Sequence, residues 1–201
     1  ARHGLALADR YSGRAKLARQ SYRHLIEEIR EELAKNNHAT GVNRLLHQRL
    51  YNSLERCADS TLYEHPVSED AAEQLDLEQA CREYDEARME AAEPANKVAM
   101  TYKWIIAMAL TGDQALRKQA RAQFQTVGKE VDVGAGFDKE RVNLLGQVAA
   151  AVLLRAEGSA DARAALQGVL AYAQSDEKRK TRRESLELQL LCAEVLLSPL
   201  P

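Results

Sequence analysis

The sequence predicts an all-α protein in which antiparallel helical hairpins stack as a short, solenoid-like array of about eight helices. Apolar residues recur at steps of three and four along most of the chain, which is the period of an amphipathic helix. No segment reads convincingly as a strand. The four prolines and ten glycines fall almost wholly between the periodic segments, so the segment interiors are left to good helix formers.

The first part of the chain, residues 1–67, is expected to form an antiparallel helical hairpin. The apolar period predicts one long amphipathic helix over residues 11–35. A turn follows, with Thr40 as the N-cap of a second helix that runs to about residue 57. A loop is then expected from Asp59 to Val67.

The second part, residues 68–201, is expected to continue the same domain. It opens with a strongly acidic connecting helix over residues 68–93, which Pro94 ends or kinks. The stretch "KVAMTYKWIIAMAL" that follows is apolar almost all round. After a break at Thr111-Gly112-Asp113, the next helix carries a single apolar stripe.

The same order of helices then returns. Residues 139–157 hold the apolar stretch "VNLLGQVAAAVLL", Gly158-Ser159 breaks the pattern, and an amphipathic segment follows. A third apolar segment, "LELQLLCAEVLL", has no partner helix. Trp104, Leu145 and Leu186 occupy similar places in the three apolar segments at intervals of 41 residues. This spacing predicts a repeat of helical pairs that bury a shared core by stacking on their neighbours.

Residues 95–197 resemble the tetratricopeptide family of helix-turn-helix repeats. Trp104, Ala120 and Phe124 match the family's spacing of an aromatic residue on the first helix and a small and an aromatic residue on the second. Leu145-Gly146 matches its Leu-Gly step, whereas Ala107-Met108 departs from it. The resemblance implies a protein-binding scaffold, and it transfers no ligand residues.

Composition excludes several classes of protein. Apolar residues make up 45% of the chain and charged residues 29%, and no apolar stretch is long enough for a membrane span. Three isolated cysteines argue against a disulfide framework, so we expect an intracellular protein of the cytoplasm or nucleus. Because the chain starts at Ala1 without a methionine, we expect a processed chain or a fragment of a larger protein.

Enzyme signatures are absent from the sequence. No histidine has a glutamate three residues before it, so the Glu-x-x-His pairs of a di-iron helical bundle cannot be built. Closely spaced cysteine and histidine ligands for zinc are also lacking. We therefore expect no catalytic residues, no metal site and no cofactor.

Charge is distributed unevenly although the net charge is only −2. Residues 1–56 hold 11 Lys/Arg against 6 Asp/Glu, residues 57–100 hold 3 against 12, and residues 101–201 hold 14 against 12. The densest basic run lies in the first turns of the last helix, where cations oppose the helix dipole. This run consists of Lys178, Arg179, Lys180, Arg182 and Arg183.

Four interpretations of the basic run remain open. It is a solvated segment steered toward the acidic helix 68–93, a surface for an acidic protein partner, a nuclear localisation signal, or part of a nucleic-acid site. We expect pairing with the acidic helix or exposure for a protein partner, because no aromatic residue lies among the cations to stack on bases.

The sequence thus favours a non-enzymatic scaffold or adaptor that binds a partner protein or peptide on a helical surface. The alternative is an RNA-binding helical module with basic patches at residues 10–23 and 178–183. The candidate partner-binding residues are Lys178, Arg179, Lys180, Arg182, Arg183, Arg14, Arg19 and Arg23.

Overall fold

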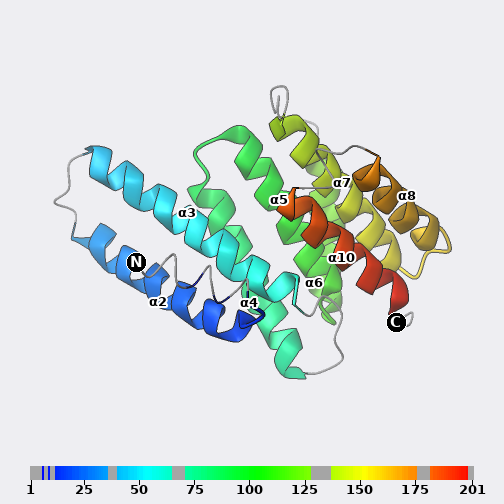
Figure 1. The fold of residues 1–201 in the computed structure, drawn as a ribbon, viewed down its shortest axis with the longest axis horizontal. Helices are drawn as coiled ribbons and strands as arrows, with labels where there is room; N and C mark the ends of the chain where they lie inside the picture. Colours follow the sequence, from blue (N-terminus) through cyan, green and yellow to red (C-terminus); the bar gives the residue numbers. More distant parts are fainter. Residues whose placement is uncertain are drawn as a thin grey trace.

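The computed structural model describes residues 6, 9, 12–35, 40–64, 71–127, 137–175 and 182–198. Within these residues it contains eight helices and no strand, which confirms the predicted all-α fold class. The helices are α2 (Ala15–Ala34), α3 (Thr40–Leu62), α4 (Ala71–Glu90), α5 (Pro94–Leu110), α6 (Gln114–Thr126), α7 (Phe137–Ala156), α8 (Ala162–Gln174) and α10 (Arg183–Leu197). They form an array that runs from α2 and α3 at one end to α7, α8 and α10 at the other (Figure 1).

Each described helix packs against the next one along the chain. In addition, α5 packs directly on α7, and α10 packs on α7 as well as on α8. The buried side chains join into one hydrophobic cluster that extends from Ala18 and Tyr22 of α2 to Val195 of α10. The eight helices therefore share a single continuous core.

The N-terminal hairpin forms as predicted, with α2 packed against α3. The predicted loop from Asp59 is wrong for its first four residues, because α3 continues to Leu62. Asp59 and Ser60 are buried there, and the Ser60 hydroxyl donates to the carbonyl oxygen of Arg56 at 2.7 Å. Polar residues that usually favour a loop stay helical here because their side chains find partners inside the protein.

The acidic connecting helix is α4, and it ends at Glu90, a few residues before Pro94. Pro94 occupies the first turn of α5, where its missing N–H costs no helical hydrogen bond. Buried residues then cover α5 on all sides from Val98 to Ala109, with Tyr102 the one residue of that span that is partly exposed. The apolar sequence of this helix is thus explained by its central place in the array.

Close contact between α5 and α7 depends on Gly146. A Cβ atom at this position would lie 3.2 Å from the ring of Tyr102. The absence of a side chain at Gly146 lets the hydroxyl end of the Tyr102 ring approach α7 closely. Tyr102 also contacts the Phe124 ring of α6, with the ring centroids 6.1 Å apart.

The three positions that define the 41-residue spacing differ in their surroundings. Trp104 and Leu145 are buried, whereas Leu186 is 45% exposed. Packing of α5 on α7 agrees with stacked helical pairs, but the third position lacks the cover that the first two have. The repeat and the tetratricopeptide resemblance stay predictions.

No helix in the described part of the chain is both long enough and apolar enough to cross a lipid bilayer.

Candidate functional site

The predicted basic run lies only partly within the described structure. Lys178, Arg179 and Lys180 fall outside the described residues, and Arg183 begins α10 with a side chain that is also outside them. The guanidinium of Arg182 forms an ion pair with Glu140 of α7 at 3.1 Å. Arg182 therefore pairs with α7, and the predicted pairing of the run with the acidic helix stays a prediction.

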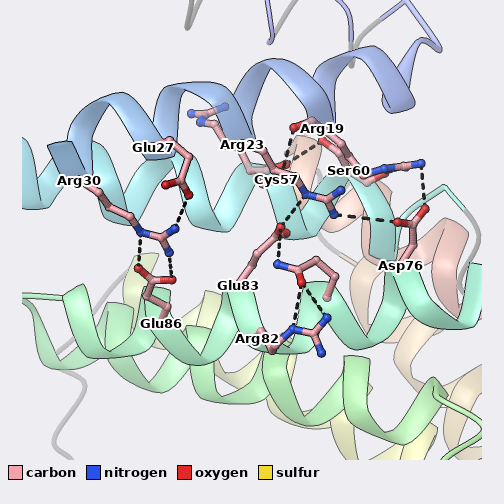
Figure 2. A network of polar contacts seen from close by, with 12 residues as sticks. Arg19, Arg23, Glu27, Arg30, Cys57, Ser60, Asp76, Arg82, Glu83 and Glu86 are labelled. Carbon is pink, nitrogen blue, oxygen red and sulfur yellow. Dashed lines mark hydrogen bonds and ion pairs between the residues drawn. The ribbon is translucent and has the colours of Figure 1, made fainter.

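Of the basic candidates on α2, Arg19 lies deepest in the protein (Figure 2). Its guanidinium donates to the Ser60 carbonyl oxygen of α3 at 3.2 Å, and it forms ion pairs with Glu64 and with Asp76 of α4 at 3.4 Å. Arg14, by contrast, is 57% exposed and pairs with Asp9 at 2.7 Å. Arg19 thus serves to join three helices.

Arg23 also faces the acidic helix. Its Nε donates to Glu83 at 3.1 Å, and the Glu83 carboxylate is buried between α2 and α4 (Figure 2). Burial alone would lower the pKa of Arg23, but the charge and hydrogen bond of Glu83 outweigh it and raise that pKa. Farther along, Arg30 pairs with Glu86 and with Glu27. Asp76, Glu83 and Glu86 of α4 are therefore paired with arginines of α2.

A second set of charges lies inside the array, and we call it the buried charge cluster. Its centre is Lys103 of α5, which is 1% exposed. The Lys103 ammonium nitrogen lies 2.9 Å from Glu55, 3.0 Å from Asp59 and 2.9 Å from Glu184. The cluster consists of Glu55, Asp59, Lys103, Arg141 and Glu184.

Arg141 of α7 is the second cation of the buried charge cluster. It binds both carboxylate oxygens of Glu184, through Nε at 2.7 Å and Nη2 at 3.1 Å. Nη2 also donates to Glu55 at 2.8 Å, and Nη1 donates to Asn96 at 3.1 Å. This two-pronged geometry fixes α10 to α7 and α3 with the most directional contact that an arginine makes.

Electrostatics keep Lys103 and Glu184 of this cluster ionised. Burial alone would lower the pKa of Lys103, but Asp59, Glu184 and Glu55 outweigh it and raise that pKa well above its ordinary value. Burial would raise the pKa of Glu184, yet Lys103 and Arg141 lower it to about 2. An ammonium held in this state has no lone pair for nucleophilic or base catalysis. The chemical role of the cluster is to hold α3, α5, α7 and α10 together.

The cysteines offer no reactive group either. Cys57, Cys81 and Cys192 are free and buried. Burial raises the pKa of the Cys81 and Cys192 thiols to about 12, so both stay protonated at neutral pH. Among the described residues, no group of three or more His, Cys, Asp or Glu side chains is placed to hold a metal ion.

Lys103 is not among the residues predicted from the sequence, because the helix around it is so apolar. That context is itself a signal, since a lysine inside a helix that is buried on all sides must find carboxylates. The partners could not be chosen from the sequence, because Glu55 and Glu184 lie 48 residues before and 81 residues after Lys103. Only the packing of α10 on α7 brings Glu184 to this place.

The outer face of α10 carries exposed apolar side chains that we call the α10 stripe. It consists of the exposed Leu186, Leu190 and Leu197 and the partly exposed Ala193, whose spacing of four, three and four places them on one side of the helix. The three leucines are 45%, 64% and 82% exposed. The opposite side of α10 is buried through Leu188, Leu191, Cys192 and Val195.

Polar contacts fix α10 at both ends. At its start, Glu184 is held in the buried charge cluster. At its end, Arg155 of α7 donates to the carbonyl oxygens of Val195 at 3.3 Å and Ser198 at 2.6 Å. These bonds satisfy carbonyl groups that a helix end leaves without intrahelical partners. The α10 stripe is thus presented on a helix whose position is already set.

Two hollows flank the α10 stripe. One has a volume of about 320 Å³, and Leu190 and Glu187 of α10 line it together with Asp59 and Glu64 from the α3 side. The other has a volume of about 630 Å³, and Leu197 lines it together with Arg155 and Arg163 from the side of α7 and α8. The two sides of the stripe therefore differ in the sign of the charges around them.

Scans against protein-family models, curated proteins and solved structures find no match to this chain.

Proposed function

We propose that this protein is a non-enzymatic scaffold that binds a helix of another protein on the α10 stripe. One observation carries the proposal: three leucines that are 45%, 64% and 82% exposed lie along one side of a helix whose other side is fully packed. Exposed apolar residues that gather in a line are a common mark of a protein-binding surface, whereas scattered ones are ordinary.

The energetics of the α10 stripe suit such binding. Burial of a leucine side chain stabilises a complex by about 1.5–3 kcal/mol when the side chain was fully exposed before. Because α10 is fixed through Glu184 and Arg155, a partner would spend little of this energy on ordering the helix. A spacing of four, three and four residues is also the spacing at which two helices interlock their side chains.

The RNA-binding alternative has less support. Arg19 and Arg23 of the proposed basic patch at residues 10–23 face Asp76 and Glu83 of α4, so their charges are matched within the chain. A patch that attracts phosphates needs cations whose charge reaches the solvent. Tight binding of an RNA oligonucleotide that weakens steeply with salt would favour the alternative over a protein-binding scaffold.

A synthetic amphipathic helix tests the proposed function. The probe is a peptide of about three heptads with leucine at a and d and with uncharged glutamine at both edges of the apolar face. We expect binding that Leu190→Glu weakens at least about tenfold, because a buried leucine contributes more than the 1.4 kcal/mol of one decade. Isothermal titration calorimetry measures the affinity.

The matched control is Leu45→Glu on α3. Leu45 is 62% exposed and Leu190 is 64% exposed, so the two substitutions change the same residue type at the same exposure. Leu45→Glu should leave binding unchanged. Equal losses in the two variants, or no binding of the peptide at all, would count against the α10 stripe as the binding surface.

A further inference from the structure

We infer that the helix that docks on the α10 stripe carries an aromatic residue, and that this residue enters the hollow between the start of α8 and the end of α10. This inference rests on the proposed function and adds the chemical class of the partner's anchor residue and the place where it binds. It follows from the lining of the hollow, from a cation beside it and from its continuity with the stripe.

The hollow of about 630 Å³ continues the α10 stripe at one end, and we call it the α8–α10 hollow. Leu197 is the last leucine of the stripe and also lines the hollow. The end of α10 lies beside the turn that leads into α8 (Figure 1). A helix that covers the whole stripe therefore reaches the hollow with one of its ends.

A turn of small residues between α7 and α8 lines the hollow. The turn begins at Gly158, whose φ of 67° is in the left-handed region that favours glycine. The Gly158 N–H donates to the Arg155 carbonyl oxygen at 3.0 Å, and the Ser159 N–H donates to that of Leu154 at 2.9 Å. These are the two hydrogen bonds of a Schellman motif. The turn is thus fixed by its own backbone, and its small side chains leave the hollow open.

Much of the lining is apolar. Ala162 and Leu166 of α8 are buried there, and Leu196 and Leu197 line the hollow from α10. The contacts of Arg155 with the last carbonyl groups of α10 fix this side of the hollow. An apolar side chain that enters the hollow leaves water without any rearrangement of the lining, and this favours binding.

Arg163 of α8 adds a cation to the lining. Its side chain is exposed, and in the described part of the chain it takes part in no hydrogen bond or ion pair. A carboxylate could pair with Arg163 but would lose hydration against the leucines, and an aliphatic side chain would leave the cation unused. An aromatic ring satisfies both, because it is apolar and its face attracts a guanidinium. The Arg88 guanidinium makes this contact inside the protein, 4.5 Å from the centre of the Trp104 ring.

A second copy of this chain fits the hollow less well. Residues 183–197, which form α10, include no aromatic residue. Pairing of two α10 helices would therefore offer the hollow no apolar side chain larger than leucine, and no ring for Arg163.

Three peptides of about three heptads test the inference, each with the same leucine seam. They differ in one residue at the edge of the seam, which is phenylalanine, cyclohexylalanine or alanine. This residue is placed in the first and in the last heptad, so that one copy reaches the hollow in either orientation of the peptide. Cyclohexylalanine matches phenylalanine in size but has no aromatic face.

We expect the phenylalanine peptide to bind about two- to fivefold more tightly than the cyclohexylalanine peptide, which is the effect of a cation–π contact at an exposed site. The cyclohexylalanine peptide should bind at least about threefold more tightly than the alanine peptide, because its larger side chain buries more apolar surface. Isothermal titration calorimetry measures the three affinities.

One pair of variants tests the cation. Arg163→Gln should make the phenylalanine and cyclohexylalanine peptides bind equally and leave the affinity for the cyclohexylalanine peptide nearly unchanged. The control is Arg49→Gln on α3, which removes the same exposed side chain from a helix that does not line the hollow. Arg49→Gln should keep the preference for phenylalanine.

A second pair tests the hollow itself. Ala160→Phe fills the hollow from the chain's own turn, so both larger peptide residues should lose their advantage over alanine. The control is Ala164→Phe, because Ala164 is exposed like Ala160 but does not line the hollow. Ala164→Phe should keep the order of the three peptides.

The outcomes separate the inference from the proposed function. Equal binding of the phenylalanine and cyclohexylalanine peptides, or a preference that survives Arg163→Gln or Ala160→Phe, overturns the inference while the scaffold function stands. If none of the three peptides binds, both fall. If the chain alone forms a dimer in analytical ultracentrifugation and Leu190→Glu abolishes that dimer, the occupant of the stripe is a second copy and the inference is wrong.

Discussion

Lys103 brings a positive charge into the most deeply buried helix of the array, and carboxylates from α3 and α10 surround it. A charge in this place costs several kcal/mol in lost hydration, and the ion pairs and hydrogen bonds offset that cost only while all partners are present. The Tyr84 hydroxyl completes the set by donating to Asp59 at 2.7 Å. Loss of one member therefore leaves the others as uncompensated buried charges.

Substitution of Lys103 tests this dependence. Lys103→Met keeps the apolar stem and removes the ammonium, so Glu55 and Glu184 would share the cation of Arg141 and Asp59 would lose its ion pair with Lys103. We expect the free energy of unfolding to fall by about 3–5 kcal/mol, as measured by urea denaturation. Lys97→Met, an exposed position on the same helix, should change it by less than about 0.5 kcal/mol. Equal losses of unfolding free energy in the two variants would show that the buried charge cluster stabilises the fold no more than an exposed lysine does.

Because of Glu184, the contribution of the buried charge cluster to the unfolding free energy should depend on pH. Its pKa is about 2 in the folded protein and near 4.5 without its partners, so the folded value is the lower one. Stability from this carboxylate is fully present above the unfolded pKa and is lost as the pH falls toward the folded pKa. We expect the difference in unfolding free energy between the wild type and Glu184→Gln to shrink as the pH is lowered from about 4.5 to about 2. A difference that stays constant over this range would contradict the ion-pair role.

At the scale of helices, patterns that depend on near neighbours could be predicted from the sequence. The apolar period predicts α2 and α3, and Pro94 predicts the boundary between α4 and α5. The pairing of charges between helices could not be predicted in the same way. The packing of α4 on α3 brings α4 beside α2, and this places Asp76 and Glu83 against Arg19 and Arg23.

Arg23 and Arg30 of α2 both pair with α4, and their substitution should lower the free energy of unfolding by different amounts. Arg23→Met leaves the buried carboxylate of Glu83 without a cation, so we expect a loss of about 1–3 kcal/mol in unfolding free energy. Arg30→Met breaks pairs with Glu27 and Glu86 that lie at the surface, and it should cost less than about 1 kcal/mol. Guanidinium denaturation of the two variants provides the comparison. A larger effect of Arg30→Met would show that the surface pairs carry the contact.

At the scale of the whole molecule, the candidate site is distributed over residues that the sequence keeps far apart. The outer leucines of α10 are visible in the sequence as part of "LELQLLCAEVLL", but the helical period alone does not tell which leucines face inward. The choice is made by Glu184, which turns one side of α10 toward Lys103 and Arg141 and so leaves Leu190 outside. The predicted cations at Arg19 and Arg23 are instead part of the contact that holds α2 and α4 together.

The continuous core predicts that the array unfolds as one unit. Trp104, the single tryptophan, is buried on α5, and the Arg88 guanidinium of α4 lies 4.5 Å above its ring, so its fluorescence reports the middle of the array. Circular dichroism at the helix band reports all the helices together. Because one apolar cluster joins α2 to α10 and the buried charge cluster links α3 to α10, we expect the two signals to give the same midpoint in urea. If the N-terminal hairpin were an independent domain, part of the helix signal would be lost at a different urea concentration from the change in Trp104 fluorescence.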